Sequence, residues 1–252
     1  MKIGIIGSGQ MGSTLASKFV EQGHEVSIAN SRGLASLQPL AASIGVKAVT
    51  VESIAKNKDV IVVSIHEKFV TDLPQHLFKD LPANVVVIDT GNYYPSLRGG
   101  YIPELDESGT DSAWVQQQLG VPVVKVFNSV FATTLRDAGR PQGDKNRIAL
   151  TVAGDDSKDK EIIFALANEM GFDAFDTGTI AQSWKQQPGS PIYCRDITLA
   201  EMKQRFEIME KTPGLRELII AKRKSDEKLM ATDYPAYLES LKEKFEPGNY
   251  QV

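Results

Sequence analysis

The sequence predicts an α/β protein with a doubly wound parallel sheet and a helical C-terminal extension. Three observations lead to this prediction. Short apolar segments alternate with helix-like segments along most of the chain. Most of the short segments are apolar on both faces, which is typical of parallel strands covered by helices on both sides. After Gln186 the strand signals stop, and only charged, helix-like stretches follow.

The predicted strands are short segments in which β-branched and other apolar residues are concentrated. We therefore expect a twisted parallel sheet of six to eight strands. The predicted segments are 2–6, 25–29, 46–49, 59–65, 85–89, 123–127, 147–153 and 173–176.

Helices are predicted where apolar residues recur at helical spacing. One covers 11–20 and ends before Gly23, a C-cap candidate, and another ends at Gly171 after a capping segment at 155–157. A run of turn-forming residues at 187–191 marks a boundary between a sheet domain, residues 1–186, and a helical extension, residues 187–252. Helices of the extension are predicted over 199–210, 215–224 and 234–245.

The composition excludes several classes of partner. The chain has 252 residues and a formal net charge of −4, and such an acidic balance argues against nucleic acid, which binds clustered Lys and Arg. The basic cluster 222–224 is followed by Asp226 and Glu227, so we interpret it as a solvated helix face. Apolar runs such as 60–63 fall far short of the roughly 20 residues that cross a bilayer. We expect neither a nucleic-acid nor a membrane partner.

Cys194 is the only cysteine. It can form neither an intrachain disulfide nor a four-cysteine metal site, so a reducing, cytoplasmic location and no metal are expected. Met1 and Lys2 lead directly into a strand, a start that does not resemble a secretory signal. We expect Cys194 to be buried as a small hydrophobic residue rather than to act as a reactive thiol.

A glycine-rich turn follows the first predicted strand. It has G-x-G-x-x-G spacing, opens a helix and leads to a second strand, which is the arrangement of a dinucleotide-binding Rossmann unit. The first glycine permits a tight turn, the second lets the backbone approach a pyrophosphate, and the third allows close packing of helix and strand. The alternative is a plain strand-to-helix turn. The predicted pyrophosphate-binding residues are Gly7, Ser8, Gly9, Gln10, Met11 and Gly12.

The end of the second strand indicates which dinucleotide binds. Sites for an unphosphorylated ribose place an acid there, whereas this chain has Asn30, Ser31 and Arg32 and no acidic residue between Glu25 and Glu52. Arg32 is able to form charge-assisted hydrogen bonds to a 2′-phosphate. We therefore predict NADP as the cofactor, with a simple polar loop as the alternative.

The segments KIGIIGSGQMG, ANSRG, VVSIHEKF, VIDTGNYYP, VVKVFNSV and RIALTVAGDD resemble the coenzyme F420-dependent NADP oxidoreductases, over roughly residues 1–184. The resemblance implies a Rossmann domain that binds NADPH, a deazaflavin hydride acceptor, and a Ser-Arg pair, here Ser31 and Arg32, on the 2′-phosphate. The cytosolic domain of the Steap metalloreductases is similar and uses a flavin. The chain departs from the family at His66, where proline is expected, and in the longer tail after Pro188.

Three predicted strands end in polar residues, which would meet at one edge of the sheet beside a nicotinamide. We expect Ile65 to pack on the ring, Gly91 to let it approach closely and Asn128 to orient its carboxamide. Helix caps and ordinary loop residues are the alternative at each position. The predicted residues of this edge are Ser64, Ile65, His66, Gly91, Asn92 and Asn128.

The hydride acceptor is less clearly indicated. His66 is the weak candidate for a proton donor to a carbonyl, whereas a deazaflavin or flavin makes less demand on protein acids. Candidate walls for a planar acceptor, with ordinary core packing as the alternative, are Trp184, Tyr193, Tyr93 and Tyr94.

These observations favour an NADPH-dependent oxidoreductase that acts on a deazaflavin or flavin-like acceptor. Two alternatives remain open: a dehydrogenase of a small carbonyl or hydroxyacid compound, and a sensor that binds NADP without turnover. We also expect a homodimer, because apolar residues at helical spacing in the extension must be buried. Packing of the extension on its own domain is the alternative; the residues are Leu215, Leu218, Ile219 and Ile220.

Overall fold

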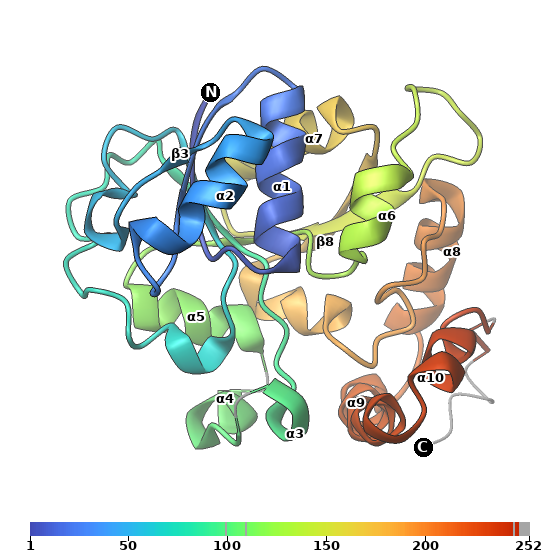
Figure 1. The fold of residues 1–252 in the computed structure, drawn as a ribbon. Helices are drawn as coiled ribbons and strands as arrows, with labels where there is room; N and C mark the ends of the chain where they lie inside the picture. The colour runs from blue at the N-terminus through green and yellow to red at the C-terminus, as the bar shows by residue number, and fades with distance from the viewer. Residues whose placement is uncertain (99, 109, 244, 247–252) are drawn as a thin grey trace.

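The structure is a computed structural model that describes residues 1–98, 100–108, 110–243 and 245–246. Its described part contains one eight-stranded sheet in the order β3-β2-β1-β4-β5-β6-β7-β8. Helices lie on both faces, with α1, α2, α6 and α7 above the sheet and α5 below it in Figure 1. The strands are β1 (Lys2–Ile6), β2 (Glu25–Ala29), β3 (Lys47–Ala48), β4 (Val60–Val63), β5 (Val86–Asp89), β6 (Val124–Lys125), β7 (Ala149–Ala153) and β8 (Asp173–Gly178).

The helices follow the alternation that the sequence predicts. The α-helices are α1 (Gln10–Glu21), α2 (Leu34–Ile44), α3 (Pro95–Arg98), α4 (Pro103–Ser108), α5 (Asp111–Leu119), α6 (Ala132–Asp137), α7 (Ser157–Glu169), α8 (Leu199–Glu210), α9 (Leu215–Thr232) and α10 (Tyr234–Ser240). Short 3₁₀ helices are η1 (Val51–Ser53), η2 (Glu67–Phe69) and η3 (Ile180–Gln186). None of these described helices is long and apolar enough to cross a membrane.

The doubly wound fold class is confirmed, and the sheet is parallel except between two strands. β6 and β7 are antiparallel and share the single residue pair Lys125–Ala153, whereas every other ladder is parallel. The chain between these two strands contains only the six-residue helix α6. A parallel connection needs a crossover back along the sheet, and an antiparallel one does not.

The strands are apolar on both faces because each face has its own core. In β1, Ile3 and Ile5 belong to the cluster under α1 and α7, and Ile6 belongs to the cluster under α5. Alternate residues of a strand point to opposite faces, so a continuous apolar run is what two covered faces require. The same alternation divides β4, where Val60 and Val62 face one cluster and Ile61 and Val63 the other.

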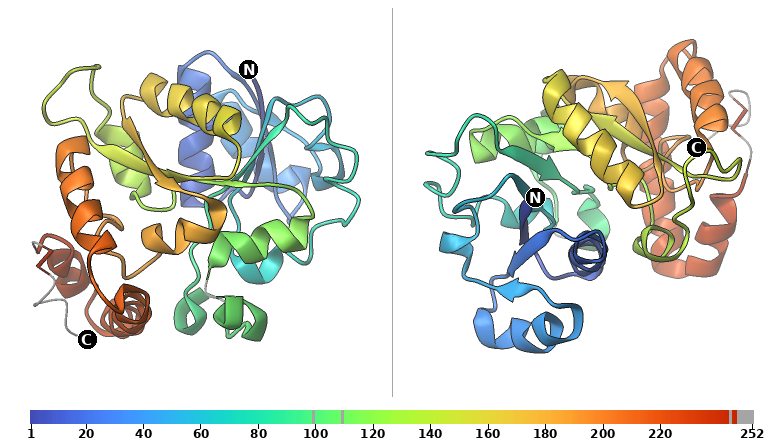
Figure 2. Two further views of the ribbon diagram at one scale, coloured as in Figure 1. Left: turned by 180° about the vertical axis from the view of Figure 1, so that it is seen from behind. Right: turned by 90° about the horizontal axis from the view of Figure 1, so that it is seen from above.

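The C-terminal helices pack on the same chain, beside β7 and β8 (Figure 2). Leu215 and Ile219 are buried in this contact, whereas Leu218 and Ile220 stay partly exposed. The predicted boundary segment 187–191 is also buried, and a Cβ on Gly189 would lie 2.4 Å from the carbonyl oxygen of Ile219. The extension thus forms a continuous core with the sheet, while the domain boundary and the homodimer stay predictions.

Candidate functional site

The glycine turn after β1 forms as the spacing predicts. Gly7 has φ of +112°, and a Cβ there would lie 2.1 Å from the carbonyl oxygen of Ser64. A Cβ on Gly12 would lie 2.2 Å from the carbonyl oxygen of Gly7. Both positions therefore require glycine, because a side chain would strike backbone. Around Gly9, in contrast, no atom lies within 4 Å of the Cβ position, so this side of the turn is open for a ligand.

The first turn of α1 provides backbone donors at this opening. The first helical hydrogen bond runs from the Ser13 N–H to the Gly9 carbonyl oxygen, over 2.9 Å. The amides of Gln10 and Met11, ahead of it in the first turn, therefore have no intrahelical partner. No side chain caps the helix and no acidic residue lies in its first turn. Free amides at a helix N-terminus suit an anion, and the open space at Gly9 lets one approach.

Asn30 connects the turn after β1 to the turn after β2. Its side-chain Nδ2 donates to Ser8 Oγ over 2.8 Å and to Ser36 Oγ over 3.0 Å, while its Oδ1 accepts from the Arg32 backbone N–H over 3.0 Å. The Asn30 amide therefore holds the two loops in register. This is a different role from ligand contact, and the sequence pattern does not reveal it.

Ser31 and Arg32 are exposed beside the glycine turn. The Arg32 Nη2 donates to Ser8 Oγ over 3.2 Å, which places the guanidinium at the mouth of the dinucleotide-binding turn. Gly33, with φ of +81°, then caps α2, whose first turn contains no acidic residue. An exposed arginine, a hydroxyl and a helix N-terminus thus converge where the second strand ends, and all three favour a phosphate.

The polar ends of β4, β5 and β6 meet at one edge of the sheet, as predicted, because these strands are neighbours. Ile65 lies against the glycine turn: its Cγ2 is 3.0 Å from the Cβ position of Gly7. Asn92 and Asn128 bond to each other, with Asn92 Nδ2 donating to the Asn128 carbonyl oxygen over 2.9 Å and Asn128 Nδ2 donating to Asn92 Oδ1 over 3.2 Å. This edge of the sheet thus places Ser64 and Ile65 against the glycine turn and joins the ends of β5 and β6 through their asparagines.

The amide of Asn128 is already used within the chain. Its Nδ2 also donates to the Gln186 carbonyl oxygen over 2.8 Å, and its Oδ1 accepts from Gln186 Nε2 over 3.0 Å. The preceding residue, Phe127, has φ of +63°, which is rare for a bulky side chain and costs about 1–3 kcal/mol. The predicted contact of Asn128 with a nicotinamide carboxamide therefore requires an exchange of these internal bonds.

His66 lies at the exposed rim of this edge. Partial desolvation, together with the positive charges of Arg98 and Lys68, lowers its pKa. Its ring is 6.4 Å from that of Phe69, and Lys68 Nζ lies 4.7 Å from the centroid of the Phe69 ring. The rim thus combines exposed aromatic rings with cations, a surface suited to a planar anion.

A buried group of ionisable side chains lies beneath this rim, and the sequence analysis missed it. Lys125 Nζ donates to Ser112 Oγ over 2.8 Å and to the Gly91 carbonyl oxygen over 3.1 Å, and it lies 3.6 Å from Asp89 Oδ2. The Ser112 hydroxyl donates to the same Asp89 oxygen over 2.6 Å. A lysine within the apolar run VVKVF is the one signal that pointed to a buried acidic partner.

Glu67 is a further buried member of this group. It follows His66, turns inward and is 3% exposed, and its Oε1 has no hydrogen-bond partner in the described part of the chain. This oxygen lies 2.7 Å from the position that a Cβ on Gly91 would take, so Gly91 makes room for Glu67. Burial, followed by repulsion from Asp111 and Asp89, raises the pKa of Glu67 to about 8.

The aromatic residues proposed as acceptor walls are placed differently. Tyr93, Tyr94 and Tyr193 are buried, and Trp184 packs in the cluster that joins β8 to the C-terminal helices. Their rings serve the core. Cys194 is buried as expected, and burial raises the pKa of its thiol to about 12.

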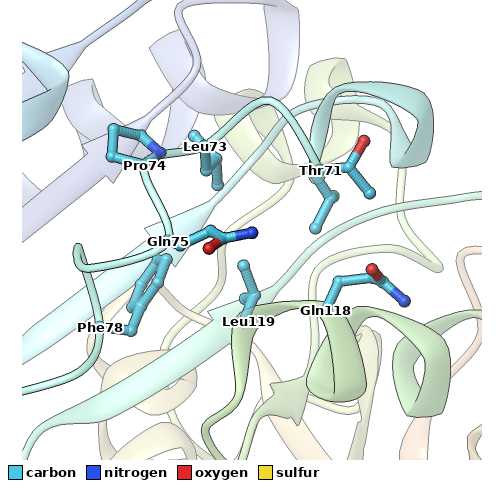
Figure 3. Close-up of a pocket in the computed structure, with 8 residues that line it drawn as sticks. Thr71, Leu73, Pro74, Gln75, Phe78, Gln118 and Leu119 are labelled. Atoms are coloured by element: carbon cyan, nitrogen blue, oxygen red, sulfur yellow. The ribbon is translucent and has the colours of Figure 1, made fainter.

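A pocket of about 200 Å³ lies elsewhere, between segment 70–78 and the C-terminal end of α5 (Figure 3). It contains none of the predicted site residues. Within the described ranges, no three His, Cys, Asp or Glu side chains are placed to hold a metal ion.

Residues 2–93 match the family of NADP oxidoreductases described as coenzyme F420-dependent. The similarity to this family covers about a third of the chain. The match runs from β1 through β5 and includes both the glycine turn and Arg32. The family resemblance seen in the sequence is confirmed over these residues.

Two curated relatives show how far the similarity extends. The putative protein YjhV of Escherichia coli is 40% identical over 78 residues, which are 31% of this chain and 57% of that protein. The metalloreductase STEAP3 of Rattus norvegicus is 27% identical over 185 residues, which are 72% of this chain and 35% of that protein. The chain therefore spans less than two thirds of the length of either relative.

Solved structures share the fold over most of the chain. The hypothetical protein SMa0349 from Sinorhizobium meliloti has a TM-score of 0.64 at 28% identity, covering 77% of this chain and 92% of that one. A putative F420-dependent NADP reductase from Arthrobacter sp. FB24 has a TM-score of 0.61 at 18% identity, covering 84% and 92%. At such identity the second similarity shows the Rossmann-type fold alone.

Proposed function

We propose that this protein is an NADPH-dependent oxidoreductase that transfers a hydride between NADP(H) and a deazaflavin or flavin-like acceptor. The observation that supports NADP over NAD is the exposed pair Ser31 and Arg32 beside the glycine turn, where an acid would hold an unphosphorylated ribose. When bound, the nicotinamide supplies the hydride. The chain contributes phosphate binding at Gly9 and Arg32 and the polar edge along β4, β5 and β6.

A planar, conjugated acceptor suits the rim better than a small carbonyl compound. Phe69 is 43% exposed, with Lys68 Nζ 4.7 Å from the centroid of its ring, and Lys68 and Arg98 line the same crevice. Such rings and cations stack on and pair with a planar anion. Reduction of a flavin or deazaflavin depends mainly on holding the two rings face to face, whereas a carbonyl needs a dedicated proton donor beside its oxygen.

The experiment is a screen of NADPH oxidation at 340 nm with F420, FMN, FAD, quinones and small ketones. We expect turnover with the deazaflavin or the flavins and none with ketones. Turnover with a ketone alone would replace the proposal by a small-carbonyl dehydrogenase. Tight NADPH binding without oxidation by any of these acceptors would instead indicate an NADP sensor.

To connect the activity to the rim, the same assay is repeated with Lys68→Ala and with Lys145→Ala, which removes an exposed lysine outside the predicted site. Loss of an exposed cation weakens attraction to an anion, so Lys68→Ala should raise the KM for the acceptor several-fold. The KM for NADPH should not change, and Lys145→Ala should leave both constants as they are.

A further inference from the structure

We propose that Glu67 is a proton-exchanging residue of the nicotinamide site: it keeps a proton while the reduced, neutral ring is bound and releases it when the oxidised, positively charged ring is bound. This inference rests on the proposed function, because it needs a nicotinamide at the edge formed by β4, β5 and β6. It adds a charge-compensating residue to a site for which the sequence analysis names only His66 as a candidate proton donor.

The first support is the position of the side chain. Glu67 begins η2, immediately after the segment 64–66 that follows β4 beside the glycine turn. Its carboxylate turns back under Gly91 at the end of β5, where Asp89 Oδ1 lies 3.0 Å and Glu67 Oε1 2.7 Å from the same Cβ position. Two carboxyl groups thus meet directly below the polar edge.

The second support is the charge balance of the buried group. Three carboxyl groups, those of Glu67, Asp89 and Asp111, are 2–3% exposed. Two cations face them: Lys125 from β6, bonded to the Asp89 and Ser112 network, and Arg223 from α9, whose charge acts on Asp111. Glu227, also buried, lies four residues after Arg223 on α9, so the buried carboxyl groups outnumber Lys125 and Arg223. A proton on one carboxyl group lowers the cost of burying this excess negative charge.

Glu67 is the member that takes this proton. Asp89 accepts from the Gly91 N–H over 2.8 Å and from the Ser112 hydroxyl over 2.6 Å, and Asp111 Oδ2 accepts from the Tyr93 N–H over 3.2 Å. Burial raises the pKa of Asp111, but the charges of Lys125 and Arg223 act against this shift. The buried Oε1 of Glu67 has no such donor. Burial and the two neighbouring carboxylates raise its pKa to about 8, so the proton is present at neutral pH.

A route to solvent exists for the proton. A small crevice opens beside Glu67 between η2 and α3, and its lining includes polar and ionisable side chains. Lys68 and Arg98 lie at its walls, and His66 at the rim has a lowered pKa and is therefore mostly neutral above pH 7. His66 has no proton to release there, which leaves Glu67 as the titrating group. The crevice residues are Glu67, Lys68, Tyr93, Tyr94, Arg98, Gly100 and Ile102.

The test measures proton release on binding, by calorimetry at pH 7.5 in two buffers with different ionisation enthalpies. We expect NADP⁺ to release a substantial fraction of one proton, and NADPH and 2′,5′-ADP to release none. Both controls carry the same 2′-phosphate, so the difference isolates the positive ring. The affinity for NADP⁺ should also rise between pH 6.5 and 8.5, by about tenfold for each unit by which the ring lowers the pKa of the carboxyl group.

Variants assign the proton to a residue. Glu67→Gln should bind NADP⁺ without proton release, whereas His66→Gln and Glu161→Gln, an exposed glutamate on α7, should release it as the wild type does. Equal proton release with NADP⁺ and NADPH, or undiminished release from Glu67→Gln, would overturn the inference. If Glu67→Gln does not fold, the comparison of NADP⁺ with NADPH in the wild type still tests whether the positively charged ring causes proton release. Failure of both nucleotides to bind would overturn the proposed function, and this inference with it.

Discussion

The two ends of the candidate dinucleotide site are built in different ways. The proposed phosphate end consists of two runs of consecutive residues, 7–12 and 30–33, and offers backbone amides and one exposed arginine. The proposed nicotinamide end collects ionisable side chains from η2, β5, β6, α5 and α9, and these side chains are buried. A local, exposed site tolerates changes that leave the turn intact. A non-local, buried one depends on every charge in the group and therefore on pH.

The largest effect is expected from removing the buried cation. Lys125→Met leaves Asp89 without its partner in a region where Lys125 is fully buried. Breaking a buried pair in this way costs about 3–5 kcal/mol, which lowers Tm by about 10 °C in a chain of this size. Thermal unfolding measures it, with the exposed Lys145→Met as the control that should stay within about 0.5 kcal/mol of wild type. A wild-type Tm for Lys125→Met would show that the buried ion pair of Lys125 with Asp89 does not stabilise the fold.

The next largest effect is expected at the phosphate end, where substitutions of two glycines in the same turn are compared. Gly7→Ala places a methyl group against the Ser64 carbonyl at a positive φ and should destabilise the fold by about 2–4 kcal/mol. Gly9→Ala meets no atom within 4 Å, so its Tm should stay near wild type. Because its methyl group occupies the predicted pyrophosphate position, Gly9→Ala should nevertheless lose NADPH binding. Equal losses of Tm in the two variants would contradict the assignment of a structural role to Gly7 and a ligand-binding role to Gly9.

The third prediction sharpens the contrast through pH. The pKa of Glu67 is about 8 in the folded protein and 4.5 ordinarily, so between these values the folded state holds a proton that the unfolded state has lost. Stability then falls as pH rises and levels off above pH 8. Between pH 6 and pH 8 the free energy of unfolding of the wild type should fall by about 2 kcal/mol more than that of Glu67→Gln. Urea unfolding at the two pH values measures this difference. If the free energies of unfolding of the wild type and Glu67→Gln differ by the same amount at pH 6 and at pH 8, Glu67 does not carry the proton.

The comparison also explains what the sequence predicts well. The bounds of β1, β2 and α8 agree with the structure because local patterning and caps determine them. The glycine turn and the exposed Ser31 and Arg32 are likewise local features. That the ends of β4, β5 and β6 meet follows from the fold class.

What the sequence could not provide depends on contacts between distant segments. Asp111 reaches the buried group only because α5 packs beneath the sheet, and Arg223 arrives from α9, more than a hundred residues later. The antiparallel ladder at Lys125 is also invisible in a run of apolar residues. No spacing in the sequence encodes these neighbours, since they are set by packing.

The most direct test of the central claim is a titration of the wild type and Arg32→Ala with NADPH and with NADH. A charge-assisted hydrogen bond to phosphate contributes about 1.5–3 kcal/mol, so Arg32→Ala should weaken NADPH binding about ten- to a hundred-fold and leave NADH nearly unchanged. Ser31→Asp should shift the preference further toward NADH, and Arg136→Ala, an exposed arginine on α6, should change neither affinity. Equal losses for NADPH and NADH in Arg32→Ala would contradict the account, because they would show that Arg32 does not bind the 2′-phosphate.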